Sequence, residues 1–114
     1  KWHLVYEMIP EEFPIFVCES AIDAISLYEL THKPGIYTAL GGLKANTLDW
    51  IIQINQIYHA GLHLNRKVFL AVDNDAAGDR FCKDFSYPRI KPAGKDWNED
   101  LIKIRAESAI DPAS

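Results

Sequence analysis

The chain has 114 residues, of which 48% are hydrophobic and 25% charged, as is usual for one globular domain with its own core. No hydrophobic run approaches the ~20 residues needed to cross a bilayer, so we expect no membrane partner, no secretory leader and a cytoplasmic protein. The formal net charge of −4 excludes a wholly basic nucleic-acid binder. Because the chain begins at Lys1 rather than Met, we expect it to be part of a longer protein.

Hydrophobic segments of strand length alternate with segments of helical periodicity along the chain. The predicted strands are 13–18, 36–40, 67–72 and 87–90, and the predicted helices are 21–31, 47–60, 76–84 and 98–109. Ser20 is a good N-cap for the first helix. In that helix Ala21, Ile25 and Tyr28 fall at helical spacing, which predicts that they pack on the sheet. Two cysteines, Cys18 and Cys82, are too few for a disulfide framework and indicate free thiols.

Strands that alternate with helices predict βαβ units with right-handed crossovers. We therefore expect an α/β fold, a single three-layer domain with a mostly parallel four-stranded sheet flanked by helices. This domain spans residues 13–109, after a lead-in or linker at 1–12 and before a tail at 110–114. Ligands of such sheets bind beyond the carboxyl ends of the strands. The polar residues that follow the predicted strands should share that rim: Glu19, Gly41, Gly42, Asp73, Asp75, Lys95 and Asp96.

The strand at 67–72 ends at two carboxylates, Asp73 and Asp75. If the backbone stays extended, both side chains leave on the same side, and carboxylates this close repel unless a cation lies between them. The other interpretation is that Asp75 only caps the helix beginning at Ala76 and that Asp73 is a turn residue. The pair alone does not decide between them.

Glu19 and Asp23 lie four residues apart at the start of a helix, so both can face the rim. Glu19 would suit a general acid–base or a metal ligand, or it would only complement the helix dipole, worth about 0.3–1 kcal/mol. Gly41 and Gly42 either let backbone approach a phosphate or simply make a turn.

Charge is unevenly distributed, with seven basic and four acidic residues over 66–95. A basic segment threaded with carboxylates suits a metal-assisted site for phosphates, and it equally suits a solvated surface. Lys95 and Asp96 are open to the same two interpretations, as a phosphate contact with a metal ligand or as an exposed loop pair.

Three segments of the chain contain most of these candidate residues. They are Glu19-Ser-Ala-Ile-Asp23, Asp73-Asn-Asp75-Ala-Ala-Gly78 and Pro92-Ala-Gly-Lys-Asp96-Trp-Asn98-Glu. Taken together, they resemble the TOPRIM domain shared by primases, topoisomerases and some nucleases. The resemblance covers about residues 13–104 and is strongest to the bacterial primase and mobile-element TOPRIM-like branch. Two positions depart from it: Ser20, where the primase motif favours glycine, and Asn98, where primases tend to place another carboxylate.

This resemblance implies a rim of five acids that binds Mg²⁺ (or Mn²⁺): Glu19, Asp23, Asp73, Asp75 and Asp96. It implies Glu19 as the catalytic acid–base, and contacts to phosphate or nucleic acid from Gly41, Gly42, Lys44 and Lys95. The implied function is metal-dependent nucleotidyl transfer in a primase-like or mobile-element replication or mobilisation protein. Its partners would be DNA or RNA, nucleotides and other domains of the parent chain.

Other functions on the same scaffold remain open. The domain could be a nuclease, or a nucleic-acid-binding or assembly module without chemistry of its own. A receiver-like or phosphatase-like domain that works through a phosphoaspartate would place an aspartate after the first strand, where this chain has Glu19.

Overall fold

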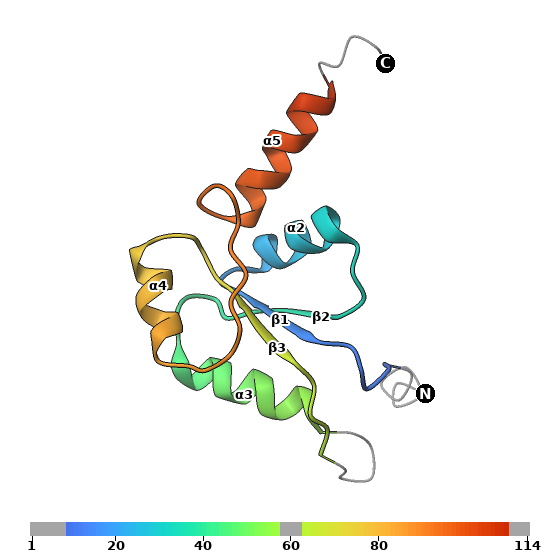
Figure 1. The fold of residues 1–114 in the computed structure, drawn as a ribbon, viewed down its shortest axis with the longest axis vertical. Helices are drawn as coiled ribbons and strands as arrows, with labels where there is room; N and C mark the ends of the chain where they lie inside the picture. The colour runs from blue at the N-terminus through green and yellow to red at the C-terminus, as the bar shows by residue number, and fades with distance from the viewer. Residues whose placement is uncertain (1–8, 58–62, 110–114) are drawn as a thin grey trace.

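The computed structural model describes residues 9–57 and 63–109. Within these ranges three parallel strands form one sheet in the order β2-β1-β3, so the α/β class is confirmed (Figure 1). Ile15 of β1 is paired with both Ile36 of β2 and Val68 of β3. In chain order the elements are β1 (Ile15–Cys18), α2 (Ala21–Thr31), β2 (Ile36–Ala39), α3 (Ala45–Asn55), β3 (Val68–Ala71), α4 (Ala76–Lys83) and α5 (Trp97–Ala109).

The two faces of the sheet carry separate hydrophobic cores, because side chains alternate along each strand. Ile15 and Val17 of β1 belong to the core beneath α3, which contributes Leu48 and Ile51, with α4 packed against it. The other core lies under α2 and the start of α5, and comprises Phe16, Cys18, Ala24, Leu27, Ala71 and Trp97. Helices therefore cover both faces and β1 is buried between them, as expected for three layers.

The prediction of a fourth strand at 87–90 is wrong. Within the described residues this segment makes one parallel bridge, in which the Leu70 N–H donates to the Pro88 carbonyl (2.8 Å) and the Ile90 N–H donates to the Leu70 carbonyl (2.9 Å). Extending this ladder in either direction would require an N–H from residue 88 or residue 92. Both are prolines, which have no N–H, so the pairing stops after one residue.

The predicted inner face of the first helix is also wrong, although its bounds are correct. Ala21 is exposed, and Ile25 and Tyr28 are 64% and 44% exposed. The side chains turned inward are those of Asp23, Ala24, Ser26 and Leu27. The cause lies in α5: the Asn98 N–H donates to the Asp23 carboxylate and the Ser26 hydroxyl donates to the Asn98 side chain. These bonds turn the polar side of α2 toward α5.

The second helix is shorter than the predicted 47–60. It ends at Asn55, and the following Gln56 has its side-chain amide bonded to both backbone groups of Arg66. Arg66 is buried and donates to the carbonyls of Pro10 and Phe13, which ties the end of α3 to the entrance of β1. Residues 58–60 of that prediction, the tail at 110–114 and most of the lead-in at 1–12 lie outside the described residues.

Two further expectations concern the cysteines and membrane-spanning helices. Cys18 and Cys82 are both free thiols, as predicted. Among the helices of the described ranges, none is long and apolar enough to cross a membrane.

Candidate metal centre

The turn after β2 positions Glu19 at the end of β1. The N–H groups of Gly41 and Gly42 both donate to the Glu19 carbonyl, at 2.9 and 3.1 Å. Gly41 and Gly42 have φ angles of +70° and +117°, which glycine adopts far more readily than other residues. In the structure this pair forms a turn whose amides are taken by Glu19 rather than left free for a phosphate.

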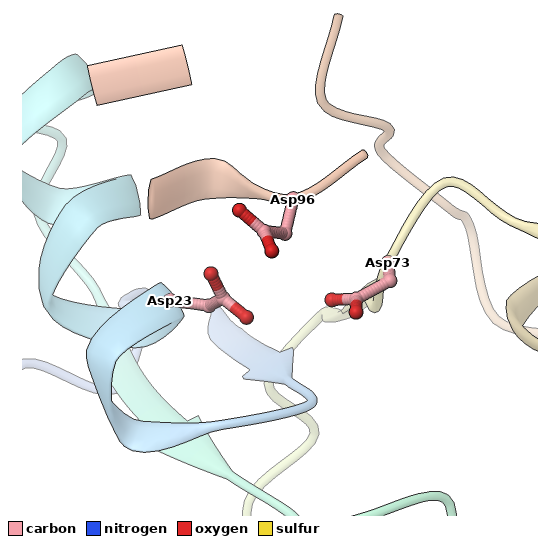
Figure 2. A group of neighbouring side chains, drawn as sticks. All are labelled: Asp23, Asp73 and Asp96. Atoms are coloured by element: carbon pink, nitrogen blue, oxygen red, sulfur yellow. The ribbon is translucent and has the colours of Figure 1, made fainter. Parts of the chain in front are cut away.

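Three carboxylates from distant parts of the chain meet at the carboxyl end of the sheet. They belong to Asp23 of α2, Asp73 after β3 and Asp96 before α5, and Figure 2 shows them turned toward one another. One oxygen from each lies within 4.8 Å of those of the other two. Mg²⁺ binds oxygen ligands at about 2.0–2.1 Å, so two ligands on opposite sides of one Mg²⁺ lie about 4.2 Å apart. The limit of 4.8 Å is slightly wider than this, so a small movement of the side chains would bring all three oxygens onto one cation.

Asp23 is the most enclosed member of the group, with 4% of its surface exposed. The Ser20 hydroxyl donates to one of its oxygens (2.8 Å) and the Asn98 N–H donates to the other (3.1 Å). The Ser20 oxygen also accepts the Asp23 N–H and so caps α2. These bonds fix the carboxylate in place before any ligand binds.

Ser20 and Asn98 thus both hold the Asp23 carboxylate. The sequence predicts that Ser20 caps the helix, and otherwise Ser20, like Asn98, is only a departure from the motif. A signal for Ser20 was present, because Ser-x-x-Asp at a helix start matches a sequence pattern that is typical of a helix N-terminus. Nothing in the local sequence indicates that the Asn98 backbone would reach Asp23, since the two are 75 residues apart.

Asp73 carries an unsatisfied group. Its Oδ1 atom is buried and has no hydrogen-bond partner within the described structure. Burial raises the pKa of Asp73 from 3.8 to about 6, with further contributions from the negative charges of Glu19, Asp23, Asp96 and Asp75. Buried polar atoms rarely lack a partner, and a cation would supply both the missing contact and the missing positive charge. The residues present therefore fit a divalent metal.

The raised pKa of Asp73 predicts how stability depends on pH without metal. Between about pH 4 and 6 the native state holds more protons on Asp73 than the unfolded state does, so its contribution to stability falls as pH rises through this window. We expect the melting temperature of the metal-free protein to fall from pH 4 to pH 6 relative to that of Asp73→Asn. With Mg²⁺ present this relative fall should disappear, because the cation favours the ionised carboxylate. Thermal melts in EDTA and in Mg²⁺ across this range check it, and parallel curves for the two proteins would contradict it.

Asp96 is held by the first turn of α5. Its Oδ1 accepts the Glu99 N–H (2.8 Å), while the Glu99 carboxylate accepts the N–H of Lys95 (3.1 Å), the residue before Asp96. Both side chains thus bind backbone N–H groups at the start of the helix. The Asp100 carboxylate accepts the N–H groups of Ala93 and Gly94. The acids that follow Asp96 therefore bind the backbone of its loop.

The other predicted site residues occupy different positions. Glu19 lies against the group, with its Oε1 accepting the Asp73 N–H at 3.4 Å. Asp75 is the N-cap of α4 and accepts the Gly78 N–H at 2.7 Å, as its capping interpretation requires. Asp75 is outside the three-carboxylate group, although its charge adds to the raised pKa of Asp73. Lys44 and Lys95 are exposed at the start of α3 and before Asp96.

Gly78 allows Asp73 and α4 to approach each other. A Cβ atom at this position would lie 2.2 Å from the Asp73 carbonyl oxygen and 3.1 Å from an Arg89 guanidinium nitrogen. In an open helix Gly→Ala would stabilise by about 0.5–1 kcal/mol, whereas overpacking costs about 1–3 kcal/mol. We expect the clash to dominate, so that Gly78→Ala lowers the free energy of unfolding by about 1–2 kcal/mol.

Chemical denaturation measures this difference. Ala77→Gly is the matched control, because Ala77 is exposed on the same turn and should lose only the helix-propensity term of about 1 kcal/mol. If Gly78→Ala stabilises the protein, the Asp73 carbonyl is not confined as described.

Comparison with known proteins identifies the family to which the chain belongs. The sequence profile described as Toprim-like matches residues 16–101. The chain belongs to the Toprim-like family. No curated protein matches it.

Among solved structures, this Toprim-like chain matches one titled as bacteriophage T7 lagging-strand DNA polymerase interacting with primase domains of two gp4 subunits bound to an RNA/DNA hybrid and dTTP. The TM-score is 0.55 at 20% identity, over 86% of this chain and 52% of that one. The likeness therefore concerns the fold, and the Toprim-like chain spans about half the length of the chain that it matches.

Proposed function

We propose that this Toprim-like domain catalyses Mg²⁺- or Mn²⁺-dependent nucleotidyl transfer on nucleic acid, as part of a primase-like replication or mobilisation protein. One observation carries the proposal: three carboxylates from three separate segments meet within 4.8 Å, and a buried oxygen of Asp73 has no hydrogen-bond partner among the described residues. Such a group is suited to a cation and hence to phosphates.

Five residues at the rim have a role in this proposal. Asp23, Asp73 and Asp96 would hold the cation, and a bound Mg²⁺ would neutralise charge on the phosphates and orient them. Glu19, adjacent to Asp73, would accept the proton of the attacking 3′-hydroxyl as its oxygen bonds to phosphorus and pyrophosphate leaves. Lys95 is exposed next to Asp96 and would contact phosphate oxygens as a mobile positive charge.

The net charge of −4 is compatible with a nucleic-acid substrate if a cation offsets the rim and other domains of the parent chain bind the template. The solved chain with the same fold comes from a complex of primase domains with an RNA/DNA hybrid and dTTP. This supports nucleic acid and nucleotides as the substrates, and neighbouring domains as partners, of the present protein.

The test is an assay of the full-length parent protein with a single-stranded template and nucleotides, in Mg²⁺ and in EDTA. Primer synthesis that requires Mg²⁺ supports the proposal. Degradation of the template instead identifies a nuclease, which the same carboxylates could also serve. If neither activity appears, the domain is a binding or assembly module. Two observations favour this alternative, because each leaves one carboxylate fewer for a metal: Asp75 caps a helix, and residue 98 has an amide side chain.

A further inference from the structure

The peptide that joins Asp73 to Asn74 is held from both sides. Its carbonyl accepts a hydrogen bond from an Arg89 guanidinium nitrogen at 3.0 Å. Its N–H donates to the Lys95 carbonyl at 2.7 Å. The turn after β3 is therefore bound to residues 89–95, the segment that leads to Asp96.

The Asn74 side chain strengthens this connection. Its Nδ2 atom donates to the Pro92 carbonyl at 3.2 Å and to the Gly94 carbonyl at 3.3 Å. An amide nitrogen carries two hydrogens and can serve both acceptors, whereas a carboxylate has none to offer. An asparagine thus fits a position that faces two carbonyl oxygens.

The opposite side of the same loop is bound by α5. The Asp100 carboxylate accepts the N–H groups of Ala93 and Gly94 at 2.7 and 2.8 Å. The loop is therefore fixed between the turn that carries Asp73 and the helix that begins beside Asp96. The Asn74 side chain contributes to the first of these two attachments, together with the Arg89 side chain and the Asn74 N–H, and it is the one that bonds the carbonyls of Pro92 and Gly94.

We propose that Asn74 is a positioning residue, which sets the separation of the Asp73 and Asp96 carboxylates and so the affinity of the rim for a divalent cation. The inference rests on the metal site of the proposed function. It predicts a large effect from a residue that has no role as a ligand, because partners that orient metal ligands typically change affinity by about 10–100-fold.

The test compares wild type with Asn74→Ala and Asn74→Asp by calorimetric titration of the 114-residue chain with MgCl₂. We expect both variants to bind Mg²⁺ about tenfold more weakly or worse. Asn74→Asp separates positioning from charge: an added carboxylate near the rim should by itself tighten Mg²⁺ binding, whereas loss of the two donated hydrogen bonds should weaken it. Asn46→Asp, on the exposed surface of α3, is the matched control and should bind as the wild type does.

A second measurement needs no metal. Amide hydrogen exchange in EDTA should be about tenfold faster in Asn74→Ala at Asn74, Ala93 and Gly94, because the two hydrogen bonds that Asn74 donates no longer hold the loop. If wild type binds Mg²⁺ and the Asn74 variants bind it equally well, the inference is overturned. If wild type binds no Mg²⁺, the proposed metal site fails. In that case the exchange experiment still tests the loop by itself: unchanged exchange in Asn74→Ala would show that the Asn74 side chain does not hold the loop.

Discussion

Replacing Glu19 by glutamine is expected to reduce nucleotidyl transfer by the full-length protein about 10²–10⁴-fold, the range for removal of a general acid–base. Glutamine retains the oxygen that accepts the Asp73 N–H in the wild type, so the junction between β1 and β3 should persist. The substitution removes only the negative charge and the ability to accept a proton. Initial rates of primer synthesis at saturating Mg²⁺ measure the effect.

The matched control is Glu29→Gln, which removes a carboxylate from the outer part of α2. Glu29 forms an exposed ion pair with Arg105 at 3.6 Å, and such pairs contribute little to stability, so this variant should have wild-type activity. Full activity in Glu19→Gln, under conditions where EDTA abolishes activity of the wild type, would exclude Glu19 as the acid–base.

The second large effect is expected from Asp73→Asn, which should abolish stabilisation by Mg²⁺. A ligand that binds only the native state stabilises it by about 2.7 kcal/mol at 100 times its Kd, and a domain of this size gains about 4–8 °C in Tm per kcal/mol. The wild type should therefore show a clear rise in Tm with MgCl₂, and the variant none. Without metal the variant should be more stable than wild type at neutral pH, since it lacks the carboxylate whose pKa is raised.

Thermal shift with increasing MgCl₂ or MnCl₂ measures both effects. Asp49→Asn is the control, because Asp49 is exposed on α3 and its loss should leave the response to Mg²⁺ unchanged. An equal rise in Tm in wild type and Asp73→Asn would place any bound cation elsewhere.

The rim could be predicted from sequence because parallel strands place their carboxyl ends on one side of a sheet. A strand-length hydrophobic run before Glu19 and another before Asp73 were enough to bring these residues to the same edge, 54 residues apart. The bounds of α2 followed from the Ser20 cap, and those of α4 from the residues around Asp75, since capping is local chemistry.

Features set by contacts between distant elements could not be predicted in the same way. The rotation of α2 that buries Asp23 and exposes Ile25 depends on α5, whose bonds to α2 have no signature in the local periodicity. The failure of residues 87–90 to form a strand is different, because Pro88 and Pro92 are visible in the sequence. The two prolines lie four residues apart, and alternate residues of an extended segment direct their N–H groups to the same side. Both missing N–H groups therefore lie on the side facing β3, which a count of hydrophobic residues does not detect.

The same two prolines have a consequence for association between chains. A strand added along β3 would need the backbone N–H and carbonyl of Leu70, which are already bonded to Pro88 and Ile90. The segment that occupies this edge pairs at one residue and carries the charged side chains of Arg89 and Lys91, features that natural proteins use against edge-to-edge aggregation. The domain can therefore be tethered to other folded domains at high local concentration without recruiting their strands at β3.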